Sequence, residues 1–247
     1  KNSGNRRNLE VDFFGGEPLM NFEVVKELVY YGRELEKIYN KNFRFTITTN
    51  GVLLTDDKID FINEHMDNVV LSLDGRKEIN DFIRPTLNEK GSFDIIVPKF
   101  KKLIDSRGEK DYYIRGTFTK FNKDFRKDLK EFYDLGFKKV SIEPVVTDPD
   151  EPYALTEEDL EEILKEYEEF SKEYIDIRKE DKEFLFFHYM IDLSQGPWVV
   201  KRLVGCGAGS EYIAVTPEGD IYPCHQFVGE KEFLLGTLDE GITNIEL

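Results

Sequence analysis

Five short apolar segments that are typical of β-strands recur up to Val146, and their spacing limits the fold of this chain more than any other feature. The segments are 9–14, 43–49, 69–74, 112–118 and 140–146. Their first residues are 34, 26, 43 and 28 residues apart, and a strand, a helix and two loops together take about thirty residues. Five such units in a row predict an α/β fold with a parallel sheet, which is either doubly wound or curled into a barrel.

Helices are predicted between these strands, at 22–39, 55–65, 92–106 and 122–136. Asn21, Thr55 and Asn122 are the expected N-caps, because Asn and Thr side-chain oxygens accept hydrogen bonds from the first backbone N–H groups of a helix. Gly136 is the expected stop of the last of these helices.

The pattern changes after Val146, and we expect three regions: a core at 1–150, a linker with a helical segment at 151–200, and a separate small unit at 201–247. Thr156 and Asp159 resemble a capping box. Apolar residues then follow at helical spacing, namely Leu160, Ile163, Leu164, Tyr167 and Phe170. Near the end, segments 211–215 and 220–222 flank a Thr-Pro-Glu-Gly turn, which predicts a small antiparallel β-hairpin.

The charge and the cysteine content exclude several classes of protein. The net charge is 34 − 50 = −16, which opposes binding to nucleic-acid phosphates and to anionic membrane surfaces. Residues 148–183 hold 16 acids against five bases, and we interpret this segment as a solvated helix face. No apolar run approaches the eighteen or so residues of a membrane span. Two cysteines do not suggest a disulfide-stapled secreted domain, so we expect a cytoplasmic protein.

The loops at the carboxyl ends of the predicted strands carry the candidate ligand-binding residues, because ligands of parallel α/β folds sit there. Gly15 and Gly16 have no Cβ, so a ligand can approach their backbone closely. Glu17 places a carboxylate at the sheet edge that is suited to an ammonium group. The same Gly-Gly-Glu-Pro segment also fits an ordinary turn. Asn50 is either a further site residue or a turn residue before Gly51.

Two arginines are further candidates. Ser72 at a strand end and Arg84 in a loop are suited to bind one carboxylate between them, although a capping Ser and a surface Arg explain each residue taken alone. Arg115 lies inside an apolar strand, where an unpaired charge is costly. We therefore expect it to point inward with a partner, either a carboxylate such as Glu143 or Glu17 or a ligand.

Cys206 and Cys224 admit three interpretations: a disulfide, half of a zinc site with His225, or part of an iron–sulfur site. Zinc and iron–sulfur clusters usually take four protein ligands, so a metal here needs ligands from outside this segment. His65 and His188 are interpreted as structural residues on helical segments.

The combination of these motifs resembles the radical S-adenosylmethionine (SAM) enzymes. The matching segments are Gly-Gly-Glu-Pro at 15–18, Thr-Thr-Asn-Gly at 48–51 and Leu-Ser-Leu-Asp-Gly at 71–75. Residues 80–85 and 91–94 look like the peptide-modifying branch with a SPASM extension, and the Cys206–Cys224 spacing resembles the start of that extension. The likeness is nearest to maturases of six-cysteine (SCIFF) peptides. It implies an incomplete (β/α)6 TIM-type barrel followed by the beginning of a small cluster-binding unit.

The resemblance implies a peptide maturase in which a 4Fe–4S cluster and SAM generate a 5′-deoxyadenosyl radical that abstracts a substrate hydrogen, leading to a Cys thioether crosslink. Its implied cofactors are SAM, that cluster, held by ligands outside this segment, and one or more auxiliary 4Fe–4S clusters. Gly16 and Glu17 are implied to meet the methionyl amino group, and Ser72 and Arg84 its carboxylate or the ribose. Gly15, Asn50 and Arg115 complete the implied cofactor site. Cys206 and Cys224 are the implied ligands of an auxiliary cluster.

The implied partners are a Cys-rich precursor peptide and an electron donor of the flavodoxin or ferredoxin type, with no nucleic acid and no membrane. The family's Cys-x3-Cys-x2-Cys motif and its later SPASM cysteines do not occur in these 247 residues. We therefore expect an excised core that lacks the first strand and is inactive by itself. The alternatives are a non-catalytic peptide-binding module and a zinc-binding α/β module.

Overall fold

The structure of the chain is a computed structural model that describes residues 3–190 and 206–244. It contains two compact units, Lys1–Met190 and Ile191–Leu247. The division lies at Met190, whereas the sequence suggested boundaries at 150 and 200. Residues 151–190 thus belong to the first unit, because Ile163 and Phe170 of this segment are buried in its hydrophobic core.

The first unit is built on a parallel sheet of six strands in sequence order, and every neighbouring pair is parallel. The strands are β1 (Asn8–Phe13), β2 (Asn42–Thr49), β3 (Asn68–Ser72), β4 (Asp111–Phe118), β5 (Lys139–Pro144) and β6 (Leu185–Phe186). All five predicted strands are confirmed, although β3 ends two residues before Asp74. The sequence missed β6, which at two residues is too short to show a period.

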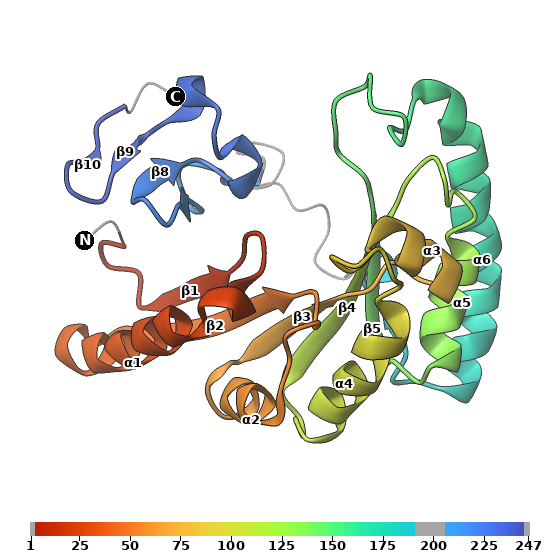
Figure 1. Ribbon diagram of the computed structural model, residues 1–247, viewed down its shortest axis with the longest axis horizontal. Helices are drawn as coiled ribbons and strands as arrows, with labels where there is room; N and C mark the ends of the chain where they lie inside the picture. The colour runs from red at the N-terminus through yellow and green to blue at the C-terminus, as the bar shows by residue number, and fades with distance from the viewer. Residues whose placement is uncertain (1–2, 191–205, 245–247) are drawn as a thin grey trace. The chain divides into compact units, whose positions relative to one another are not determined.

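Helices follow the strands, and all but the short α3 lie along the outer side of the curved sheet (Figure 1). They are α1 (Phe22–Tyr39), α2 (Asp56–His65), α3 (Lys77–Ile83), α4 (Phe93–Asp105), α5 (Arg126–Asp134) and α6 (Leu160–Glu180). The strands bury alternate residues against these helices, for example Phe45 and Ile47 of β2 and Val140 and Ile142 of β5. This is the predicted incomplete (β/α) barrel. The sequence did not predict α3.

None of the three predicted N-caps makes a side-chain capping bond. Thr55 stands at the N-cap position of α2, but its hydroxyl donates to the Asp57 carboxylate at 2.6 Å. Asn21 makes no side-chain capping bond at α1. Asn122 lies four residues before α5, and its amide oxygen instead accepts hydrogen bonds from the N–H (2.8 Å) and hydroxyl (3.0 Å) of Thr119. The Asn122 amide oxygen therefore stabilises the turn at Thr119 and does not cap α5. Gly136, as predicted, follows α5, with φ 88°.

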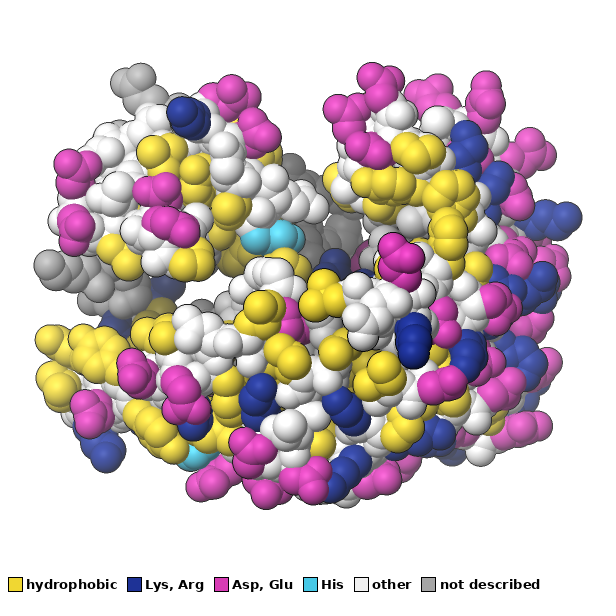
Figure 2. All heavy atoms as spheres, in the orientation of Figure 1, with side chains coloured by type: hydrophobic (Ala, Val, Ile, Leu, Met, Phe, Trp, Pro, Cys, Tyr) yellow, Lys and Arg dark blue, Asp and Glu magenta, His cyan; other side chains and the backbone are white. Residues whose placement is uncertain are grey.

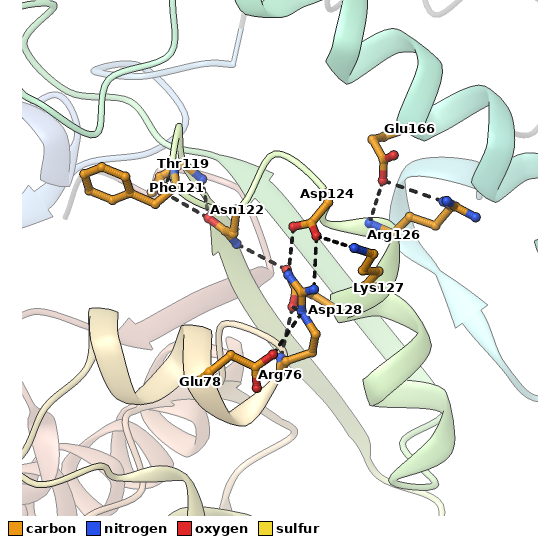
Figure 3. A network of polar contacts seen from close by, with 10 residues as sticks. All are labelled: Arg76, Glu78, Thr119, Phe121, Asn122, Asp124, Arg126, Lys127, Asp128 and Glu166. Atoms are coloured by element: carbon orange, nitrogen blue, oxygen red, sulfur yellow. Dashed lines mark hydrogen bonds and ion pairs between the residues drawn. The ribbon is translucent and has the colours of Figure 1, made fainter.

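A partly buried ionic network joins the loop after β3 to the start of α5 (Figure 3). The Arg76 guanidinium donates to Asp124 at 2.7 Å and to Asp128 at 2.8 Å, and the Asp128 side chain is fully buried. A Cβ on Gly75 would lie 2.3 Å from Asp128, so the loop can approach this closely only with glycine. The network fixes the loop that leads away from the carboxyl end of β3.

Helix α6 is attached to the core by its apolar stripe. The predicted capping box is present at Thr156 and Asp159. Phe170 is fully buried, but Leu160 and Leu164 are 52% and 67% exposed, so the stripe is narrower than predicted. Most acidic side chains of the helix are exposed. Figure 2 shows Asp and Glu interspersed with Lys and Arg on the side where α5 and α6 lie in Figure 1, which confirms the solvated face.

The second unit contains a small antiparallel sheet with the order β10-β9-β8-β7. Its strands are β7 (Ala214–Val215), β8 (Asp220–Tyr222), β9 (Gly236–Thr237) and β10 (Gly241–Ile242). The β7–β8 pair confirms the predicted hairpin, and its turn is closed by the Gly219 N–H donating to the Thr216 carbonyl at 2.9 Å. Strands β9 and β10 were not predicted, because each has only two residues. Within the described residues, no helix combines the length and the apolar character that crossing a membrane requires.

Candidate functional site

The sheet of the first unit has one apolar face against the helices and one polar face, which we call the helix-free face. Alternation along the strands places on it Asp12, Thr48, Ser72, Arg115, Thr117, Ser141 and Glu143. Parallel pairing brings Ser72 opposite Arg115, and Arg115 opposite Ser141. Charged and hydroxyl groups therefore gather near the carboxyl ends of β3, β4 and β5, where parallel sheets bind ligands.

The glycine loop after β1 leaves its backbone accessible. Gly15 has φ +123°, a backbone conformation that residues other than glycine rarely adopt. Gly16 needs no special φ, and a Cβ built on it would meet nothing within 4 Å. The absence of a side chain at Gly16 is therefore not required by the packing of the described residues. A side chain at Gly16 would instead fill the space through which a ligand can approach the backbone.

The Glu17 carboxylate is engaged by the chain itself. It accepts hydrogen bonds from the Leu19 N–H at 3.0 Å, the Thr49 hydroxyl at 2.8 Å and the Asn50 N–H at 2.8 Å. The first bond caps the 3₁₀ helix at Pro18–Asn21, and the other two join the glycine loop to the end of β2. A carboxylate has about four acceptor positions, so little capacity remains for a ligand's ammonium group. Glu17 fixes the shape of the loop.

Asn50 is a turn residue. Its side-chain oxygen accepts from the Val52 N–H at 3.0 Å, and Gly51 follows with φ +76°. A Cβ on Gly51 would lie 2.2 Å from the Phe100 ring, so this glycine serves packing.

Arg84 binds a carboxylate that belongs to the chain. Its Nε donates to Asp74 at 2.5 Å and its Nη2 at 3.2 Å, and the Asp74 side chain is fully buried. Asp74 also accepts from the Thr117 N–H at 2.9 Å, which ties the loop after β3 to β4. Ser72 is half-buried at the end of β3, and its hydroxyl has no hydrogen-bond partner among the described residues. Arg84 is thus occupied by Asp74, whereas the Ser72 hydroxyl is available to a ligand.

Arg115 does not form the expected ion pair. It is exposed on β4, and within the described part of the chain its guanidinium has no hydrogen bond or ion pair. The ion-pair alternative with Glu143 or Glu17 is thus wrong, and the alternative of a ligand contact stays a prediction. The guanidinium avoids the cost of burial by standing on the helix-free face. Its charge still reaches Glu143 and contributes to lowering the pKa of that carboxyl, after the larger effects of hydrogen bonds from His188 and Ser141.

Cys206 and Cys224 are both free, so the disulfide interpretation is wrong. Cys224 Sγ lies 3.6 Å from His225 Nδ1, and the same nitrogen lies 2.8 Å from the Tyr212 hydroxyl. Among residues 3–190 and 206–244, no three His, Cys, Asp or Glu side chains are grouped as a metal site. The two cysteines and His225 therefore do not complete a zinc site by themselves.

Sequence reasoning missed the engagement of Asp74 and the role of His188. Asp74 was visible as part of the Leu-Ser-Leu-Asp-Gly segment, but nothing in the sequence paired it with Arg84. His188 lies in a 3₁₀ helix after β6 (Phe187–Tyr189) and contacts Glu143, 45 residues away. Since β6 itself was not predicted, its neighbour could not be placed.

Comparisons with known proteins agree with this architecture. The sequence pattern of the Radical SAM superfamily matches residues 5–136, which is more than half of the 247 residues. The chain is 30% identical over 252 residues to the cysteine-type anaerobic sulfatase-maturating enzyme of Clostridium novyi (strain NT), and covers 63% of that protein. That alignment takes in 95% of this chain.

A second relative is the antilisterial bacteriocin subtilosin biosynthesis protein AlbA of Bacillus subtilis (strain 168), 25% identical over 239 residues. That match covers 93% of this chain and 47% of AlbA. A solved structure, native anSMEcpe with bound AdoMet and Kp18Cys peptide, superposes with a TM-score of 0.74 at 19% identity. It covers 98% of this chain and 67% of that one, and shows the fold. The extent of the superfamily match decides the classification: the chain belongs to the radical SAM superfamily.

Proposed function

We propose that this chain is the core of a radical SAM enzyme that modifies a ribosomally made peptide and forms a Cys thioether crosslink. The observation that carries the proposal is the open glycine loop at the carboxyl end of β1, in a chain of this superfamily. Two relatives with peptide-related names or ligands, AlbA and the peptide-bound anSMEcpe, support a peptide as the substrate class.

The residues on the helix-free face fit SAM. Gly15 and Gly16 expose backbone to the methionyl group, and a side chain at Gly16 would fill that approach. Ser72 and the exposed Arg115 are free to bind its carboxylate or the ribose hydroxyls. In this proposal Glu17, Asn50 and Arg84 act by holding the surrounding loops, because their polar groups are already bonded within the chain.

Bound together, SAM and a reduced 4Fe–4S cluster supply a 5′-deoxyadenosyl radical that abstracts a hydrogen atom, while the protein supplies position and the exclusion of water. The ligands of that cluster are not among the cysteines of this chain. Cys206 and Cys224 are proposed to ligate an auxiliary cluster of a SPASM-type unit. The proposed partners are a Cys-rich precursor peptide and a flavodoxin- or ferredoxin-type electron donor, in the cytoplasm.

The test is a reaction with the intact protein. It is reconstituted anaerobically with iron and sulfide, then incubated with SAM, dithionite and a synthetic library of cysteine-containing peptides. We expect 5′-deoxyadenosine together with a peptide that has lost two hydrogen atoms and one alkylatable thiol. Release of 5′-deoxyadenosine with every peptide unchanged would reject the peptide substrate class.

A further inference from the structure

Four side chains form an unbroken line of hydrogen bonds that runs from β5 through the 3₁₀ helix after β6 to α6. On β5, the Ser141 hydroxyl donates to Glu143 Oε1 at 2.5 Å. Glu143 Oε2 lies 3.0 Å from His188 Nε2, just beyond β6. His188 Nδ1 in turn lies 2.9 Å from the Tyr167 hydroxyl on α6. The proposed function uses none of these contacts.

The chemistry of the partners fixes the tautomer of His188. An ionised carboxylate only accepts hydrogen bonds, so Nε2 must be the nitrogen that carries the proton. In the neutral ring Nδ1 is then an acceptor, and the Tyr167 hydroxyl donates to it. Burial raises the pKa of Tyr167 to about 12, so the phenol keeps its proton near neutral pH. His188 is therefore held from both sides in one orientation.

This support makes Glu143 a fixed negative charge and a poor proton acceptor. The hydrogen bond from His188, with that from Ser141, lowers the pKa of the Glu143 carboxyl below its ordinary value. Each oxygen accepts one of these bonds, which leaves about two acceptor positions open. The side chain is 32% exposed, and no Lys or Arg of the described residues lies within ion-pair distance of it. It is positioned to receive a donor from outside.

We propose that Glu143 is the binding group for a primary ammonium of the peptide substrate, with His188 as its positioning residue. This inference rests on the proposed function. The glycine loop follows β1, and β5 is four strands away in the sheet order. The sheet is curved, so this order sets no distance between the two positions. We assign the glycine loop to SAM and Glu143 to the second reactant.

The charged surroundings also act on the ligand. Arg115 on the neighbouring strand β4 is exposed, and its charge reaches Glu143. The other titratable groups facing Glu143 from packed elements are His188 and, behind it, Tyr167. A lone cation would be partly repelled by Arg115. The SAM carboxylate that the proposed function places on Arg115 would offset that repulsion.

The test uses the intact protein and two blocked peptides, acetyl-Gly-Lys-Glu-Gly-amide and the same peptide with norleucine in place of lysine. Binding is followed by NMR titration, and SAM binding is measured in parallel. Glu143→Gln should weaken the lysine peptide about tenfold, the effect of losing one charge-assisted hydrogen bond. It should leave the norleucine peptide and SAM unchanged. Equal affinity of the two peptides for the unchanged protein would overturn the proposal.

His188 provides a matched pair of variants. In His188→Gln the amide can still donate to Glu143 and accept from Tyr167, so the lysine peptide should bind within about threefold of the unchanged protein. His188→Ala should bind it about tenfold more weakly, because Glu143 loses its orienting donor. Equal binding by both variants, or a ¹⁵N spectrum with the His188 proton on Nδ1, would reject the positioning role.

The parallel measurement of SAM binding distinguishes a failure of this proposal from a failure of the proposed function. If Glu143→Gln weakens SAM rather than the lysine peptide, Glu143 belongs to the cofactor site and the ammonium proposal is wrong. A failure of the intact protein to release 5′-deoxyadenosine would reject the proposed function and leave the peptide-binding comparison to be judged on its own result.

Discussion

Glycines at the strand ends of the first unit differ in what a methyl group would meet. A Cβ on Gly51 would collide with the Phe100 ring, and one on Gly116 would lie 2.7 Å from the Leu73 carbonyl. Both positions are glycine because the packing requires it. Gly16 has open space around its Cα hydrogens and an ordinary φ. A functional requirement is the remaining reason for glycine there.

Gly16→Val should therefore leave folding intact and weaken ligand binding. A Cβ at this position meets no protein atom within 4 Å, and the branched side chain occupies the approach to the loop backbone. We expect the melting temperature to change little and SAM affinity in the intact protein to fall at least about tenfold, the loss of a hydrogen bond to a charged group. Calorimetry with Gly16→Ala as the milder control checks this. Unchanged affinity in the Val variant would remove the glycine loop from the site.

Asp128 makes stability depend on pH. Burial raises the pKa of its carboxyl from 3.8 to about 6 in the folded chain, despite the bonds from Arg76. A raised folded-state pKa means that the folded form binds the proton more tightly. The associated stability is present below about pH 4 and is lost as the pH rises through 6. The two pKa values limit the effect to about 3 kcal/mol.

Asp128→Asn removes this titration, since the amide keeps the shape and has no proton to lose. Relative to the unchanged protein, the variant should gain stability between pH 4 and pH 7, by up to about 3 kcal/mol. Urea unfolding at the two pH values measures the difference. If the stability gap between the two proteins is the same at both, the carboxyl titrates normally in the folded state.

Local sequence signals identified part of the site and missed the rest for a physical reason. Gly15 and Gly16 were visible because glycine pairs at a strand end have a local conformational meaning. The Glu143–His188–Tyr167 line was not, because its partners are 45 and 21 residues apart. Arg115 was expected to need a partner because its strand is apolar. Strand β4 is buried on one face only, and Arg115 lies on the other face.

Helix α6 shows what the spacing of apolar residues can and cannot predict about an element. Spacing predicted the helix and its start, and the capping box at Thr156 is present. Spacing did not tell which residues of the apolar set touch the sheet: Phe170 does, and Leu164 stands in solvent. The short elements α3 and β6 carry too few residues for any period to appear.

Two residues of α6 provide a matched test of this difference. Phe170→Ala should lower the free energy of unfolding by about 3–5 kcal/mol, because it leaves a cavity between α6 and the sheet. Leu164→Ala on the same helix should change it by less than about 0.5 kcal/mol, since that side chain is 67% exposed. Chemical denaturation of both variants compares them. Similar losses would show that α6 packs by another face.

At the scale of the whole molecule, the chain joins a (β/α) unit to a small antiparallel unit that contains both cysteines. If Cys206 and Cys224 ligate an auxiliary cluster, changing both to Ala in the intact, reconstituted protein should remove about four iron atoms. Release of 5′-deoxyadenosine should persist while the peptide product is lost. Iron analysis with both residues changed to Ser as a second variant checks this, and an unchanged iron content would exclude the cluster role.

The central proposal is that this chain is the SAM-binding core of a radical SAM enzyme, and the release of 5′-deoxyadenosine by the full-length protein tests it most directly. The intact protein is reconstituted with iron and sulfide, supplied with SAM and reduced with dithionite under anaerobic conditions. We predict 5′-deoxyadenosine from the unchanged protein, and less of it from Gly16→Val at equal iron content. No 5′-deoxyadenosine from the fully iron-loaded, unchanged protein would contradict the account.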